Sequence, residues 1–133
     1  MKYMVLLGRI LYTFIFLKAA PGHFTDGTIA YAASHGVPLA SIVVPITGVI
    51  LILGGLSVLL GYKAKYGAYL LVLFLVPVTL TMHQFWGLSD PMAVMAQKTN
   101  FIKNVSMLGA ALLIAHFGSG PLSLDNVLAK RNK

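Results

Sequence analysis

The segment FIKNVSMLGAALLIAHF, residues 101–117, decides the fold class of this chain. At about 1.5 Å per residue, a helix of this length just crosses a hydrocarbon core of roughly 30 Å. The segment nevertheless carries Lys103 and Asn104 near its start and His116 near its end. Such groups are unfavourable in lipid unless they face the interior of a helix bundle, pair, or reach the interface. The segment therefore predicts a membrane helix with a polar inner side.

The composition points to the same class. The chain has 133 residues, of which 58% are hydrophobic and 10% charged, and its mean hydropathy is +0.84. Soluble domains contain about 25% charged residues. The absence of cysteine excludes disulfides, thiolate metal sites and cysteine nucleophiles. The basic residues behind the +7 net charge flank apolar runs instead of forming a patch, so no nucleic-acid partner is expected.

Three further apolar runs precede the quoted segment. We predict an all-α membrane protein, a four-transmembrane-helix bundle forming a single domain over residues 1–133. Arg9 and Lys18 within the first run argue against a cleaved signal peptide. The expected spans are 4–20, 42–61, 66–85 and 101–117, followed by a cytoplasmic tail at 118–133.

Short helices are expected outside the spans. The two outer loops predict interfacial helices at 28–34, ended by Gly36, and at 92–97. Ser123 is the predicted N-cap of a short helix in the tail.

The distribution of basic residues predicts the orientation. One side of the predicted bundle receives most of them, namely Lys2, Lys63, Lys65, Lys130, Arg131 and Lys133. The first loop on the other side contains no lysine or arginine, and the second contains only Lys98. The positive-inside rule therefore places both termini in the cytoplasm (N-in, C-in), with the lipid bilayer as the first partner.

Small residues gather in the second span. Small side chains let helices approach closely in lipid, so we expect helix packing at these positions, although a ligand cleft at the glycine pair is an open alternative. The predicted helix-packing residues are Gly48, Gly54, Gly55, Ser57, Gly61 and, in the fourth span, Gly109.

Polar residues at the outer helix ends predict a ligand site. If the helices are antiparallel, the pairs Lys18/His23, His83/Gln84 and Lys103/Asn104 reach one level of the bundle, while Arg9 and His116 lie roughly 15–20 Å away from it. Two donors and an imidazole suit a quinone-like oxygen or an anionic headgroup. The ligand-binding candidates are Lys103, Asn104, His83, Gln84 and Arg9.

A simpler interpretation of these residues stays open. Lys103 is then an interfacial anchor, Asn104 an interhelical hydrogen-bonding group, and Arg9 the donor to a free carbonyl. His83 and His116 are too far apart to ligate one metal or haem, and His23 with His83 lacks a carboxylate, so no metal site is expected. No span contains Asp or Glu, and no catalytic residue is identified.

Several stretches, taken together, resemble the DoxX family of small four-helix bacterial inner-membrane proteins. They are Gly8-Arg9-Ile10-Leu11 with Phe16, Gly36-Val37-Pro38, Gly54-Gly55-Leu56 with Gly61, His83, Phe101-Ile-Lys103-Asn104 with Gly109, and Gly118-Ser-Gly-Pro121 with Ser123-Leu124-Asp125. Two positions depart from the family pattern. Leu51 stands near the place of a glutamate found in many members, and His23 stands where many have a lysine.

The resemblance implies an accessory subunit of quinone-linked redox complexes. Its cofactor would be a quinone, its partners redox-complex subunits or a second copy of the chain, and independent catalysis is not expected. Two alternatives differ in class. One is a structural or assembly subunit that packs on a larger partner through the glycine-rich face of the second span. The other is a small-metabolite carrier, against which the absence of internal repeats and of paired broken helices counts.

Overall fold

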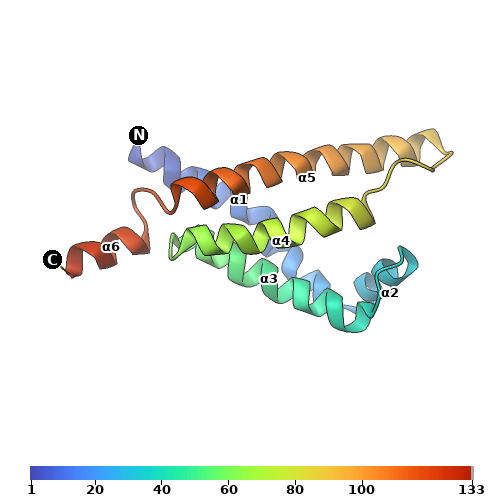
Figure 1. Cartoon of the computed structure of the whole chain (residues 1–133), viewed down its shortest axis with the longest axis horizontal. Helices are drawn as coiled ribbons and strands as arrows, with labels where there is room; N and C mark the ends of the chain where they lie inside the picture. Colours follow the sequence, from blue (N-terminus) through green and yellow to red (C-terminus); the bar gives the residue numbers. More distant parts are fainter. Residues whose placement is uncertain (133) are drawn as a thin grey trace.

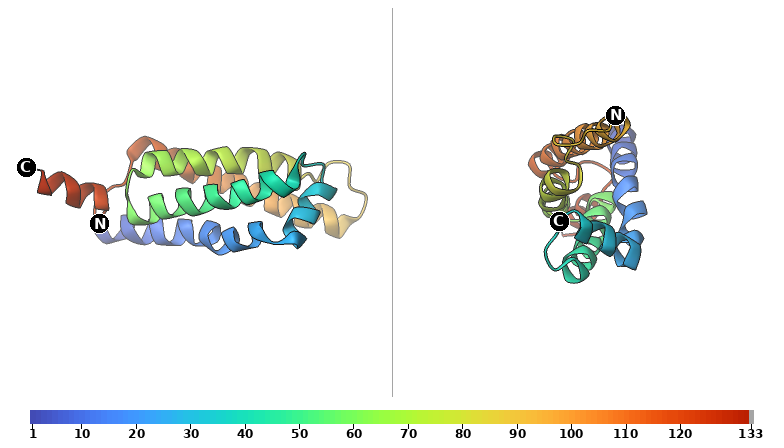
Figure 2. Two further views of the ribbon diagram at one scale, coloured as in Figure 1. Left: turned by 90° about the horizontal axis from the view of Figure 1, so that it is seen from below. Right: turned by 90° about the vertical axis from the view of Figure 1, so that its right-hand side faces the viewer.

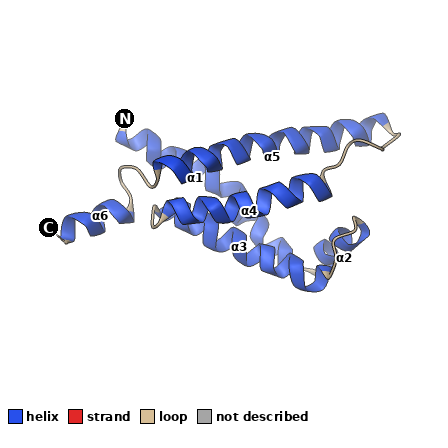
Figure 3. Ribbon diagram, in the orientation of Figure 1, coloured by secondary structure: helices blue, strands red, loops and turns tan. Residues whose placement is uncertain are grey.

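The computed structural model describes residues 1–132, and it consists of four long and three short helices (Figures 1 and 3). The long helices are α1 (Lys2–Ala19), α3 (Ala40–Leu60), α4 (Ala64–Met82) and α5 (Pro91–Phe117). The short ones are the 3₁₀-helix η1 (Ala20–Phe24), α2 (Asp26–Ser34) and α6 (Leu124–Arg131). Residues 1–132 contain no strand, so the all-α prediction is confirmed.

The long helices form an antiparallel bundle in chain order. α1 packs against α3, α3 against α4, and α4 against α5, while α2 and η1 cover one end of α3 (Figure 2). Both termini and the α3–α4 turn lie at one end of the bundle, which we call the terminal end. The opposite, distal end carries α2 and the α4–α5 connection (Figure 1).

All four long segments have the length and hydropathy of membrane spans, the first continuing through η1 to Phe24. Inside the bundle, large apolar side chains such as Phe16, Leu51 and Leu71 are almost fully buried. On the outside, the helices expose apolar residues such as Phe14, Leu73 and Leu113. An apolar exterior around an apolar core is stable in lipid but not in water, so the chain is a multi-pass membrane protein.

The predicted helix at 92–97 followed by a separate span at 101–117 is wrong. α5 runs unbroken from Pro91 to Phe117. Its start is fixed by Asp90, whose carboxylate accepts a hydrogen bond from Ala93 N at 3.0 Å, and by Pro91 at the first helical position. No glycine or proline follows until Gly109, so nothing interrupts the helix at residue 100. The other two short helices are confirmed as α2 and α6, the latter capped by Ser123.

The glycine-rich face of α3 is used for packing within the chain. A Cβ at Gly54 would lie 3.0 Å from Gly67 O, one at Gly55 2.7 Å from Leu17 Cδ2, and one at Gly48 2.8 Å from Phe24 Cζ. The idea that this face packs on a larger partner is therefore wrong, because α1, η1 and α4 already occupy it.

Of the other predicted packing residues, Ser57 also packs against α4, since a Cβ at Gly67 would lie 2.5 Å from Ser57 Cβ. Ser57 Oγ donates to Tyr62 O at 2.7 Å, which helps to close the α3–α4 turn. Gly61 ends α3 in the left-handed conformation, with φ +65°. Gly109 is exposed on α5, and a Cβ there would meet nothing within 4 Å.

Candidate functional site

A cavity of about 480 Å³ lies at the distal end between α2, α3 and α4. We call it the distal pocket, and its volume is in the range of small-molecule sites, roughly 300–1,000 Å³. Most of its lining is apolar, including Val44, Ile50, Leu73 and Phe74. The polar groups of the lining are His23, Thr28, Tyr31, Thr47, Thr81 and His83.

His23 enters this pocket from η1, at the end of the first span. Its Nδ1 lies 2.8 Å from Thr47 Oγ1, and that hydroxyl donates its only proton to Val44 O at 2.6 Å. Thr47 Oγ1 must therefore accept from His23 Nδ1–H. In the neutral ring this leaves His23 Nε2 as an unprotonated acceptor.

His83, which also lines the pocket, is held in the same way. It follows the last residue of α4, and its Nδ1 lies 2.9 Å from Gln97 Oε1 on α5. An amide oxygen only accepts, so Nδ1–H is the donor and Nε2 is again left as an acceptor. Two histidines distant in sequence thus line one apolar cavity with their Nδ1 atoms occupied and their Nε2 atoms free.

The structure does not bring the predicted ligand residues together. Lys103 is exposed and donates to Asn100 Oδ1 on its own helix at 3.2 Å, while Asn104 is buried in the middle of α5. Gln84 is exposed beside His83. The expected convergence of Lys103 with His83 fails because α5 starts at Pro91 and places Gln97, not Lys103, next to the imidazole. His23 takes the expected place of Lys103; the sequence puts it at the right level but gives no sign that it shares a cavity with His83.

Arg9 lies at the terminal end and cannot contribute to the distal pocket. Its side chain is 4% exposed, and its Nη2 donates to Leu122 O in the tail. This matches the simpler interpretation of Arg9 as the donor to a backbone carbonyl.

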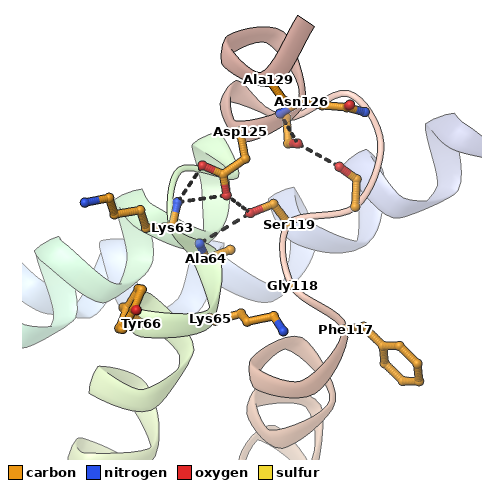
Figure 4. Close-up of a pocket in the computed structure, with 12 residues that line it drawn as sticks. Lys63, Ala64, Lys65, Tyr66, Phe117, Gly118, Ser119, Asp125, Asn126 and Ala129 are labelled. Carbon is orange, nitrogen blue, oxygen red and sulfur yellow. Dashed lines mark hydrogen bonds between the residues drawn. The ribbon is translucent and has the colours of Figure 1, made fainter. Parts of the chain in front are cut away.

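The terminal end is closed by a polar network around Asp125 (Figure 4). Both carboxylate oxygens of Asp125 accept from Lys63 N at 3.0 Å, and Ser119 Oγ donates to Oδ2 at 2.5 Å. Ser119 Oγ also accepts from Ala64 N at 3.3 Å. The network joins the tail to the start of α4, beside an open cavity of about 510 Å³. Backbone groups and a serine already satisfy the carboxylate, so we assign this network a structural role.

Comparison with protein families identifies the chain. The sequence profile of the SURF4 family matches residues 1–131. The chain belongs to the SURF4 family. The resemblance to the DoxX family is therefore a wrong assignment, and the redox role that it implied loses its basis.

This SURF4-family chain is similar in sequence to three proteins from two organisms. Inner membrane protein YphA of Escherichia coli is 34% identical over 100 residues, covering 75% of this chain and 71% of YphA. Inner membrane protein YqjF of the same organism is 30% identical over 131 residues, covering 96% of this chain and 93% of YqjF. ER-derived vesicles protein ERV29 of Saccharomyces cerevisiae is 32% identical over 79 residues, covering 59% of this chain but only 25% of ERV29. No solved structure matches the chain.

Proposed function

We propose that this protein is a single-domain, multi-pass protein of the bacterial inner membrane that binds a small, largely apolar molecule in the distal pocket. The observation that carries the proposal is the pair His23 and His83, each with its Nδ1 occupied inside the protein and both lining one cavity of about 480 Å³. Apolar walls with a few fixed polar groups are typical of ligand sites.

The inner-membrane location is supported by the relatives and by charge. Both E. coli relatives carry the name inner membrane protein. The terminal end collects Lys2, Lys63, Lys65, Lys130 and Arg131, and by the positive-inside rule this supports a cytoplasmic location for this end and both termini. The distal pocket then lies toward the periplasmic side.

The hydrogen-bonding character of the pocket defines the ligand class. Nε2 of His23 and of His83 can accept but not donate, so the pocket favours a molecule with hydroxyl or N–H donors. A phenol or a quinol satisfies this requirement, whereas the carbonyls of an oxidised quinone cannot hydrogen-bond to either Nε2 and would depend on other lining groups such as the Tyr31 hydroxyl. A quinone-like ring is thus retained as a ligand class, in its reduced form, and no electron-transfer role is proposed. Of the five residues predicted from the sequence as ligand contacts, His83 alone lines the distal pocket.

The test is binding of two matched probes to the full chain in nanodiscs, a decyl-substituted benzoquinol and the corresponding benzoquinone. We expect the quinol to bind at least about five-fold more tightly, because each unpaired acceptor facing a carbonyl costs on the order of 1 kcal/mol. His83→Phe keeps a ring of similar size but removes the acceptor, and it should weaken quinol binding by about the same factor.

His116→Phe is the matched control, since His116 is exposed at the terminal end of α5 and lines no part of the distal pocket. It should leave quinol binding unchanged. Equal affinities for the two probes, or equal quinol binding by wild type and His83→Phe, would show that the pocket does not select donors and would refute the proposal.

A further inference from the structure

Arg9 carries hydrogen-bonding capacity that the protein does not use. Nη2 donates to Leu122 O, but Nε and Nη1 are buried and have no partner among residues 1–132. Among residues 1–132, Asp125 is the only acidic side chain at this end of the bundle, and its carboxylate accepts hydrogen bonds from Lys63 N and Ser119 Oγ. Asp125 supplies a negative charge near Arg9, but it leaves the Nε and Nη1 donors of the guanidinium without an acceptor, so this end of the bundle keeps a local surplus of positive charge.

A groove between α1 and α5 leads to Arg9. It has a volume of about 310 Å³, and Arg9 is its only charged lining residue. Its walls include Val5, Gly8 and Tyr12 from α1 and Ala110 and Leu113 from α5. α1 and α5 are joined by the hydrogen bond from Tyr12 Oη to Met107 O at 3.0 Å, but unlike the other neighbouring long helices they do not pack closely along their backbones.

The groove is open toward lipid, and its charged end lies at headgroup level. Gly8 is exposed, and Leu113 and Phe117 are among the most exposed apolar residues of the bundle. The guanidinium of Arg9 reaches Leu122 O and would overlap a Cβ at Gly61, so it lies level with the ends of α3 and α5. Lys65 packs beside Gly118 on the same rim, where a Cβ would be 3.2 Å from Lys65 Cε.

We propose that this α1–α5 groove binds an anionic phospholipid of the adjacent leaflet. The phosphate lies at the end of the groove nearest Arg9, where the positive charge of the guanidinium attracts it. One acyl chain lies along the apolar groove past Gly8 and Ala110. The surplus of basic residues at this end selects an anionic over a zwitterionic headgroup.

The experiment is native mass spectrometry of the full chain released from nanodiscs containing equal amounts of phosphatidylglycerol and phosphatidylcholine with identical acyl chains. We expect the protein to retain phosphatidylglycerol in at least about ten-fold excess, because the two lipids share the phosphate but only phosphatidylcholine carries a choline cation, which the basic residues of this end repel. Gly8→Leu fills the groove and should abolish this excess without touching Arg9, because a Cβ at Gly8 meets nothing within 4 Å.

Gly109→Leu is the matched control, since a Cβ there also meets nothing within 4 Å and Gly109 does not line the groove. It should retain phosphatidylglycerol like wild type. If Gly8→Leu does not fold, Ala110→Leu on the opposite wall fills the same space. Retention of phosphatidylglycerol by the groove-filling variant, no preference between the two lipids, or displacement of the lipid by inorganic phosphate alone would each overturn the proposal.

Discussion

The two ends of the bundle differ in whether their side-chain hydrogen bonds join distant segments or stay local. At the terminal end, hydrogen bonds connect elements far apart in sequence, such as Arg9 with Leu122 and Lys63 with Asp125. At the distal end, most side-chain hydrogen bonds stay within one turn, as between Ser34 and Tyr31, and only His23–Thr47 and His83–Gln97 join separate elements. Hydrogen bonds between distant segments therefore hold the terminal end together, whereas the distal end contains a mostly apolar cavity, the distal pocket.

The difference shows how a small membrane bundle can hold a cavity without losing its fold. Helix association in lipid depends on packing and on hydrogen bonds rather than on the hydrophobic effect. Here the close packing of α3 on α4 and the hydrogen-bond network around Asp125 hold the helices together at the terminal end. The helices can therefore lie further apart at the distal end, around the distal pocket. Substitutions at the terminal end should accordingly affect stability, and those at the distal end should affect binding.

The largest loss of stability is expected for Gly61→Ala. Gly61 has φ +65°, which disfavours a side chain, and its Cβ would overlap Arg9 Nη1 and Ser123 Cβ. Strain and overpacking together predict a loss of about 3 kcal/mol in the free energy of unfolding, measured by denaturant titration in detergent. Gly109→Ala is the control and should change stability by less than about 0.5 kcal/mol, because that position faces open space. Similar stabilities of the two variants would mean that the terminal end is not tightly closed.

A smaller loss is expected for Asp125→Ala. The substitution removes the acceptor for Lys63 N and Ser119 Oγ, and it should lower the free energy of unfolding by about 2 kcal/mol. The tail should also become accessible to protease, which can be followed by limited trypsin digestion after Lys130. Asp26→Ala, at the exposed start of α2, is the matched control and should leave both measurements near wild type.

The sequence predicts the architecture of this protein well because the signals are local. Apolar runs of membrane length, the Asp90-Pro91 start, the Ser123 cap and Gly61 each determine structure within a few residues. The sequence does not reveal that 92–97 and 101–117 belong to one helix, because Lys98 and Asn100 between them are typical of loops. A helix can nevertheless continue beyond the bilayer with polar side chains, as α5 does.

The site is harder to predict because it depends on the relative position of helices. A shift of α5 by a few residues replaces Lys103 with Gln97 beside His83. His23 and His83 are 60 positions apart by their numbers, and no spacing rule connects them. Short stretches such as Gly54-Gly55 also occur in many membrane proteins, which explains how they led to the wrong family.

An intermediate and local effect is expected for Asp90→Ala at the distal end. Asp90 caps α5, and loss of an N-cap costs about 1 kcal/mol, but only the first turn of the helix depends on it. Amide hydrogen exchange should therefore rise at residues 92–94 and stay unchanged in the part of α5 beyond Asn104. Faster exchange along the whole of α5 would instead mean that the two ends unfold as one unit.

The smallest effect is the coupling between the ends, which should be close to zero. Thr47→Val removes the hydrogen bond to His23 and should cost about 1 kcal/mol alone. On α3, Thr47 and Gly61 are separated by about 20 Å of helix, so Thr47→Val and Asp125→Ala share no partner. In a double-mutant cycle their effects on the free energy of unfolding should add to within about 0.5 kcal/mol. An interaction energy well above this value would show that closing the terminal end also shapes the distal pocket, and the two ends would then have to be treated as one site.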